Sequence, residues 1–164
     1  MTSIIAFPNL ISRLNRQFVS FAGVVVAVLM ITTAFLAPAY AADVPSDDEQ
    51  DVMIRSTLAT FNDANMTGNY SILIAKASKQ FQEQMSAEKL AAGTENFRKN
   101  HLFFESIVTD DYESSEKATI DQEGALNLAG VFKGDEIKVT YKLRFVQNAN
   151  QWKLIGINVN ATKI

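Results

Sequence analysis

The hydrophobic positions between residues 47 and 66 follow the period of an α-helix. Apolar side chains recur at the i, i+4, i+7 spacing of one helix face, at Ile54, Leu58 and Phe61. Ser46 precedes this stretch and Glu49 follows three residues later, which is the spacing of a capping box. Gly68 comes after it and suits the left-handed end of a helix. We therefore predict one long amphipathic helix over residues 47–66.

Shorter helical patterns occupy the chain up to about residue 100. Residues 70–77 predict a second helix, and its apolar residues expected to turn inward are Ile72, Leu73 and Ile74. Ser86 is placed to cap a third helix over residues 87–100, with an expected buried face of Leu90 and Phe97. Residues 102–108 fit both the end of that helix and a strand, so both alternatives stay open.

After residue 110 the pattern changes to the period of two that β-strands show. Clusters of turn residues separate four expected strands, which cover residues 112–120, 125–133, 136–147 and 152–160. The third strand is the clearest, because its apolar residues alternate strictly: Ile137, Val139, Tyr141, Leu143 and Phe145. Such alternation indicates one buried face and one face in contact with solvent.

The last predicted strand contains an interruption. Leu154 and Ile155 are both apolar and Gly156 follows them, a pattern typical of a β-bulge. Beyond the bulge we expect the core-facing set to be Ile155, Ile157 and Val159. Helices followed by an antiparallel meander predict an α+β domain, in which the N-terminal helices pack on one face of a curved antiparallel sheet.

Two short motifs resemble a known superfamily. Gly68-Asn69-Tyr70 follows the first predicted helix, and Trp152-Lys153-Leu154-Ile155-Gly156 opens the last predicted strand. With this order of elements, residues 46–162 resemble the nuclear-transport-factor-2-like superfamily, in particular its small exported bacterial members of undefined role. The resemblance implies a cone in which the sheet wraps around the helices, with an apolar pocket at its mouth. The superfamily includes ketosteroid isomerases and dehydratases as well as non-catalytic binding modules, so the fold alone does not decide the function.

The beginning of the chain has the composition of an export signal. Two arginines precede a run of apolar and small residues over 21–36, and no acidic residue occurs before position 43. Pro38 follows this run, and Ala39-Tyr40-Ala41 offers small residues at the positions that a signal peptidase inspects. We predict a Sec-type signal that is cleaved after Ala41.

This prediction divides the chain into a signal peptide over residues 1–41, a short tether over 42–45 and a single domain over 46–164. It places the domain in the bacterial periplasm or outside the cell. The alternative is an uncleaved signal anchor, since the 16 residues of the apolar run approach the ~17 needed to span a bilayer. In that alternative the signal segment is the membrane contact.

Composition narrows the possible partners and chemistry. Without residues 1–41 the chain has 13 Lys and Arg against 18 Asp and Glu, a net charge of −5. This charge disfavours nucleic acid as a partner, because phosphates require a basic surface. The chain has no cysteine, which excludes disulfides, thiol catalysis, thiolate metal ligands and a lipid-modified cysteine. An exported domain without disulfides fits a bacterial periplasm.

The outward face of the third strand carries basic residues. Lys138, Lys142 and Arg144 alternate there, with Lys133 and Lys153 on the neighbouring strands. They form either a basic stripe that meets an acidic partner or an ordinary charged face that discourages strand pairing. A large apolar dimer interface on this face is unexpected, so we predict a monomer or a weak homodimer.

Catalytic candidates are few. Tyr141 is the polar group on the inward face of the third strand, and an isomerase-like site would pair it with a carboxylate from Asp110 or Asp111. His101 is the only histidine and is expected to lie at a helix end. Because the sequence has no phosphate-binding loop, nucleophile motif or metal-ligand spacing, we assign no catalytic residue, no metal and no cofactor.

We therefore expect an exported, non-catalytic binding or interaction module. Its apolar pocket is expected to accept a small hydrophobic ligand or the side chains of an envelope protein. The residues predicted to line or border the pocket are Phe61, Tyr141, Phe145 and Trp152. One alternative is an isomerase- or dehydratase-like enzyme that uses Tyr141 and a carboxylate, and another is a membrane-anchored envelope module with an uncleaved signal.

Overall fold

The computed structural model describes residues 43–164. The predicted signal peptide and its cleavage site lie outside the described residues. Within the part of the chain that is described, no helix is long and apolar enough to cross a membrane.

The first described helix, α2, spans Asp47–Thr67 and confirms the long amphipathic helix predicted from the sequence. Ser46 forms the predicted capping box: its Oγ accepts a hydrogen bond from the Glu49 amide at 3.3 Å, and the Glu49 carboxylate accepts one from the Ser46 amide at 3.0 Å. Gly68 ends the helix in the left-handed region, with φ of 72°. The buried face includes the three predicted apolar residues Ile54, Leu58 and Phe61.

Four short helices and one 3₁₀-helix follow α2. They are α3 (Ser71–Lys76), α4 (Lys79–Gln84), α5 (Ala87–Gly93), α6 (Glu95–Lys99) and η1 (Glu105–Val108). The sequence did not predict α4, whose N-cap is Ser78, where the side chain accepts a hydrogen bond from the Phe81 amide. The predicted third helix is divided at Thr94, and the open alternative for residues 102–108 resolves to a loop and η1. In α3, Leu73 is buried as expected, whereas Ile72 is 61% exposed and the prediction that it faces inward was wrong.

The strands form one open antiparallel sheet. They are β1 (Tyr112–Ser114), β2 (Thr119–Ile120), β3 (Ala125–Lys133), β4 (Ile137–Asn148) and β5 (Gln151–Lys163). The predicted strand over residues 112–120 consists of two short pieces, β1 and β2, which both pair with β3. The strands β3, β4 and β5 then follow as a meander. In β4, the side chains of Val139, Tyr141, Leu143 and Phe145 are buried on one face, as the alternation predicted.

The predicted β-bulge is present between β4 and β5. Arg144 pairs with Gly156 and Phe145 pairs with Leu154, so that Ile155 is the extra residue without a cross-strand partner. Leu154 is buried before the bulge, and Ile157 and Val159 pack against the core after it. The expectation that Ile155 belongs to the core-facing set was therefore wrong, because Ile155 is the extra residue of the bulge and falls outside the alternation of the strand.

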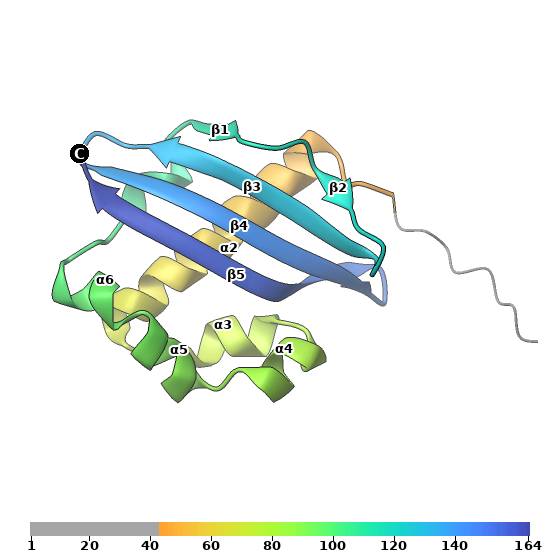
Figure 1. Ribbon diagram of the computed structural model, residues 1–164, viewed down its shortest axis with the longest axis horizontal. Helices are drawn as coiled ribbons and strands as arrows, with labels where there is room; N and C mark the ends of the chain where they lie inside the picture. The colour runs from red at the N-terminus through yellow and green to blue at the C-terminus, as the bar shows by residue number, and fades with distance from the viewer. Residues whose placement is uncertain (1–42) are drawn as a thin grey trace, which may run out of the picture. The chain divides into compact units, whose positions relative to one another are not determined.

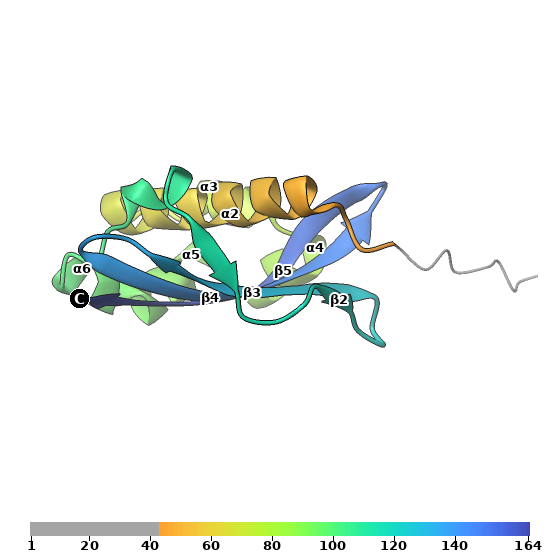
Figure 2. The ribbon, with the colours of Figure 1, turned by 90° about the horizontal axis from the view of Figure 1, so that it is seen from above.

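The helices and the sheet form an α+β arrangement. In Figure 1, α2 crosses one face of the sheet and α3–α6 follow along the side of β5. Figure 2 shows that the opposite face of β3 and β4 has no described helix over it, and that the β4–β5 hairpin curves toward the layer of α2. The Ser78 amide donates a hydrogen bond to the Leu154 carbonyl at 2.9 Å and thus joins the start of α4 to β5.

Candidate ligand-binding groove

A groove of about 250 Å³ lies among α2, α3 and the β4–β5 hairpin. Its apolar lining comes from all three elements: Met53, Leu73, Phe145, Trp152 and Leu154. Its polar lining comes from Ser56, Thr57, Thr60, Lys76 and Lys153. Lys153 alternates with Trp152 and Leu154 along β5, so its side chain leaves the strand on the opposite face. The groove therefore combines an apolar surface with a rim of hydrogen-bond donors.

The helix α2 contributes a second stripe beside its buried face. Met53, Thr57 and Thr60 have the i, i+4, i+7 spacing, displaced by one residue from the buried Ile54, Leu58 and Phe61. Such a stripe lies at the boundary between core and solvent. Its side chains line the groove because the neighbouring α3 and the hairpin leave this boundary uncovered.

The hairpin contributes the aromatic part of the groove. In the β4–β5 ladder, Phe145 pairs with Leu154 and Gln147 pairs with Trp152, so Trp152 lies two positions beyond the buried pair on the same face. The curvature of the hairpin toward the α2 layer is visible in Figure 2. The half-buried Trp152 therefore stands at the edge of the core, where β5 begins.

A second, more open hollow of about 510 Å³ adjoins the groove near the start of α2. The two hollows share Met53, Trp152 and Lys153. The second one also reaches Val52, which is 65% exposed, and the carboxylate residues Asp48 and Glu49. The apolar surface thus continues from the groove toward the first turns of α2.

The four residues predicted to line a pocket occupy two different settings. Phe145 and Trp152 lie together in the groove. Phe61 is 3% exposed and packs edge-on against Phe97 at 5.4 Å between ring centroids. Tyr141 is 1% exposed and its ring lies 5.8 Å from that of Phe132. Sequence reasoning missed Met53, Leu73 and Lys76, and the displaced stripe on α2 was the signal available for Met53.

The Tyr141 hydroxyl is buried and has no hydrogen-bond partner among residues 43–164. Burial raises the pKa of Tyr141 well above its usual value, because a phenolate loses its hydration there. The Asp110 carboxylate accepts a hydrogen bond from the Ser106 hydroxyl at 2.6 Å, and Asp111 is exposed. Neither aspartate is hydrogen-bonded to Tyr141. His101 is exposed after the end of α6.

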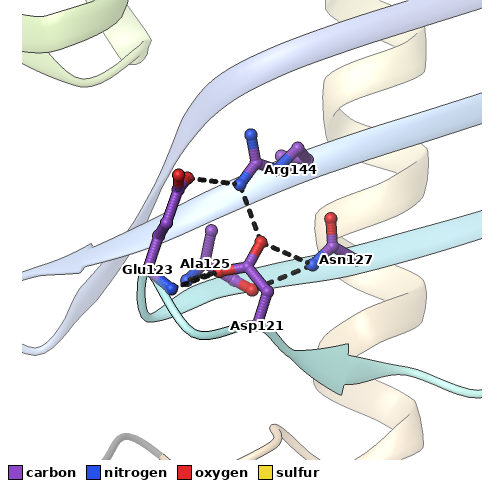
Figure 3. Close-up of polar contacts among 5 residues, drawn as sticks. All are labelled: Asp121, Glu123, Ala125, Asn127 and Arg144. Carbon is purple, nitrogen blue, oxygen red and sulfur yellow. Dashed lines mark hydrogen bonds and ion pairs between the residues drawn. The ribbon is translucent and has the colours of Figure 1, made fainter.

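The basic residues on the outer face of the sheet are largely paired with carboxylates. Lys133 forms an ion pair with Glu113 at 2.9 Å, and Lys142 forms one with Glu116 at 3.6 Å. The Arg144 guanidinium contacts Asp121 at 2.7 Å and Glu123 at 3.0 Å, as Figure 3 shows. These carboxylates offset most of the positive charge expected on this face.

Asp121 is the centre of the cluster in Figure 3. Its carboxylate accepts hydrogen bonds from the Asn127 side chain at 3.1 Å, from the Ala125 amide at 3.0 Å and from Arg144 at 2.7 Å. These bonds, with that from Asn127 the strongest contribution, lower the pKa of Asp121 well below its usual value. The cluster holds the turn between β2 and β3 against β4, which is a structural role.

A third hollow of about 300 Å³ lies beside η1 and the turn between β3 and β4. Four carboxylate residues line it: Glu105, Asp110, Asp135 and Glu136. Across the described residues, no three His, Asp or Glu side chains are placed to hold a metal ion together. The groove at Trp152 is therefore the better candidate for a binding site, because it joins apolar lining to donors.

Comparison with protein-family models, curated proteins and solved structures finds no match to this chain. The candidate site therefore depends on the geometry and chemistry of the groove. Its shape is set by α2, α3 and the β4–β5 hairpin, and the hairpin is far from the two helices in the sequence.

Proposed function

We propose that this chain is an exported, non-catalytic binding module that takes a small hydrophobic ligand in the groove at Trp152. The observation that carries the proposal is the apolar lining shared by Met53, Leu73 and Trp152 at a site open to solvent. Binding sites for small molecules are typically concave and join apolar surface to polar groups that orient the ligand, and half of the residues that line this groove are apolar. The volume of about 250 Å³ lies just below the ~300 Å³ at which such sites commonly begin, which suits a small ligand.

The same proposal includes a cone-shaped, nuclear-transport-factor-2-like fold. Helices on one face of an antiparallel meander support it, as does the curvature of the β4–β5 hairpin toward α2. It also includes export through the signal over residues 1–41, with cleavage after Ala41 and a location in the periplasm or outside the cell. The composition of that segment and the absence of cysteine in the chain support export.

The buried Tyr141 favours a binding module over an isomerase-like enzyme. A catalytic phenol has to reach the substrate, whereas Tyr141 is 1% exposed. A catalytic phenol also needs a partner for proton transfer, and the Asp110 carboxylate is hydrogen-bonded to Ser106 instead of to Tyr141. An envelope protein that inserts an apolar side chain into the groove remains the alternative ligand, and the test below separates the two.

The test uses Trp152 as the reporter, since it is the only tryptophan in the chain. Titration of the protein with 1-decanol, a neutral alkyl probe, should shift the Trp152 emission and reach saturation. Thr57→Phe fills the groove from the α2 side and should abolish the saturable shift. Thr119→Phe places the same ring on exposed β2 and serves as the matched control. Absence of a saturable shift in the unaltered protein would contradict a small-ligand function and favour the protein partner.

A further inference from the structure

We propose that the ligand of this groove is an anionic amphiphile, an alkyl chain that ends in an acidic group such as a carboxylate. This inference rests on the proposed function, because it names the chemical class of the ligand at the same site. The ammonium group of Lys76 would receive the acidic group, and the apolar lining at Leu73, Phe145 and Trp152 would receive the chain.

The charge of the groove differs in sign from that of the domain. The part of the chain after residue 41 has a net charge of −5. The charged residues that line the 250 Å³ groove are Lys76 and Lys153, and no carboxylate residue lines it. The Lys153 side chain leaves β5 on the face opposite Trp152, so Lys76 supplies the cation. A cation without an anion beside an apolar surface complements a ligand that has one acidic group and one apolar part.

Lys76 has no ion-pair partner in the described part of the protein. Among residues 43–164, no carboxylate oxygen lies within ion-pair distance of its ammonium group. The Lys76 ammonium donates one hydrogen bond, to the Thr60 hydroxyl at 3.1 Å. An ammonium group has three donors, so Lys76 keeps donors for a ligand.

Hydroxyl groups on α2 add to the donors near Lys76. Ser56, Thr57 and Thr60 lie along α2 on the same side of the groove. A hydroxyl proton can rotate to donate to a carboxylate oxygen. The Thr60 hydroxyl already accepts from Lys76 and donates to the Ser56 carbonyl at 2.7 Å, and the Ser56 hydroxyl donates to the Met53 carbonyl at 3.3 Å. Thr57 is therefore the hydroxyl that we expect to contact the acidic group.

The distribution of charge along the two hollows orients the ligand. Lys76 and Leu73 line only the inner groove, whereas Asp48 and Glu49 line only the outer hollow. An acidic group at the outer end would meet two carboxylates and be repelled. We therefore place the acidic group near Lys76, with the alkyl chain running past Trp152 toward the exposed Val52.

The experiment compares three probes that share one alkyl chain and differ in charge. Decanoate, 1-decanol and decyltrimethylammonium are each titrated against the protein below their aggregation concentrations, with Trp152 emission as the readout. The inference predicts that decanoate binds about tenfold more tightly than 1-decanol, and that the cation binds most weakly. A preference of this size corresponds to about 1.4 kcal/mol, which hydrogen bonds from the Lys76 ammonium and the Thr57 hydroxyl to a charged carboxylate can supply.

Charge-removing variants locate the acidic group. Lys76→Met keeps most of the aliphatic stem, so it should weaken decanoate binding by about three- to fivefold and leave 1-decanol binding unchanged. Lys138→Met, on the outer face of the sheet, is the matched control and should change neither affinity.

The outcomes separate this inference from the proposed function. If 1-decanol binds at the groove and decanoate binds no more tightly, the anionic ligand is wrong and the apolar binding module stands. If Lys76→Met lowers the affinity for decanoate and for 1-decanol equally, that result would also contradict a charge contact. If neither probe binds to the unaltered protein, the proposed function fails together with the inference.

Discussion

Tyr141 lies directly opposite Gly130 in the β3–β4 ladder, and a Cβ atom at Gly130 would come within 2.5 Å of the Tyr141 hydroxyl oxygen. The same atom would lie 2.8 Å from the Glu113 carbonyl oxygen, which belongs to β1. The absence of a side chain at Gly130 therefore leaves room for the tyrosine ring on β4 and for the backbone of β1 beside β3. This close approach explains why a residue without a side chain occurs inside a strand.

We predict that Gly130→Ala lowers the free energy of unfolding by about 1–3 kcal/mol, because the added methyl group overpacks a site closed by backbone and ring atoms. Urea unfolding measures the change. Gly93→Ala is the control, since no atom lies within 4 Å of its Cβ position at the end of α5. That variant should be neutral or stabilising by up to ~1 kcal/mol. Equal effects of the two variants would contradict the packing assigned to Gly130.

Two buried tyrosines should respond differently to loss of the hydroxyl group. The Tyr141 hydroxyl has no partner among the described residues, so Tyr141→Phe removes an unpaired buried polar group and should be neutral or stabilising. The Tyr70 hydroxyl donates to the Asn65 side chain at 2.5 Å and accepts from Arg98 at 2.6 Å. Tyr70→Phe should therefore lower the free energy of unfolding by about 1–3 kcal/mol.

Thermal and urea unfolding of the two tyrosine variants test this contrast. A large loss of stability in Tyr141→Phe would mean that its hydroxyl is hydrogen-bonded in solution. That result would also revive the alternative in which Tyr141 serves a polar ligand or substrate.

The cluster at Asp121 should make the free energy of unfolding depend on pH in the acidic range. The pKa of Asp121 is lowered in the folded protein, so its charged form stabilises the fold at neutral pH. This contribution should decline as the pH falls below about 4, the usual pKa of an unfolded aspartate, and should vanish below the lowered folded pKa. Asp121→Asn should thus be less stable than the unaltered protein at pH 7, and the gap should narrow at acidic pH.

Urea unfolding at pH 7 and pH 3 measures the two gaps. Asp111→Asn is a suitable control, because Asp111 is exposed and should give a pH dependence like that of the unaltered protein. A gap for Asp121→Asn that stays constant from pH 7 to pH 3 would contradict the hydrogen bonds from Asn127, Ala125 and Arg144.

Local patterns predicted the long elements well. The helix α2, its capping box and the alternation along β4 were all predicted, because each depends on residues that are close in sequence. The short helices were harder. A six-residue helix such as α3 has too few turns to establish a phase, and packing against α2 decides that Leu73 is buried and Ile72 is not.

The groove could be predicted only in part. Phe145 and Trp152 were two of the four residues expected to line or border a pocket. Alternation shows which face of a strand is buried, but it does not show how deeply each residue on that face is buried. It therefore did not distinguish Phe145 and Trp152 from Tyr141 in the core. Lys76 contributes to the groove through its contact with Thr60, which lies 16 positions away in the chain, and local patterns do not reveal that contact.

The measurement that tests the central claim most directly is a methyl NMR titration with 1-decanol. The account predicts that the Met53, Leu73 and Leu154 methyl signals shift and saturate with the same dissociation constant as the Trp152 emission. The Val131 methyl signals, on β3 away from the groove, should stay in place. Shifts that appear at Val131 instead, or that never saturate at Met53 and Leu73, would contradict a ligand site between α2 and the β4–β5 hairpin.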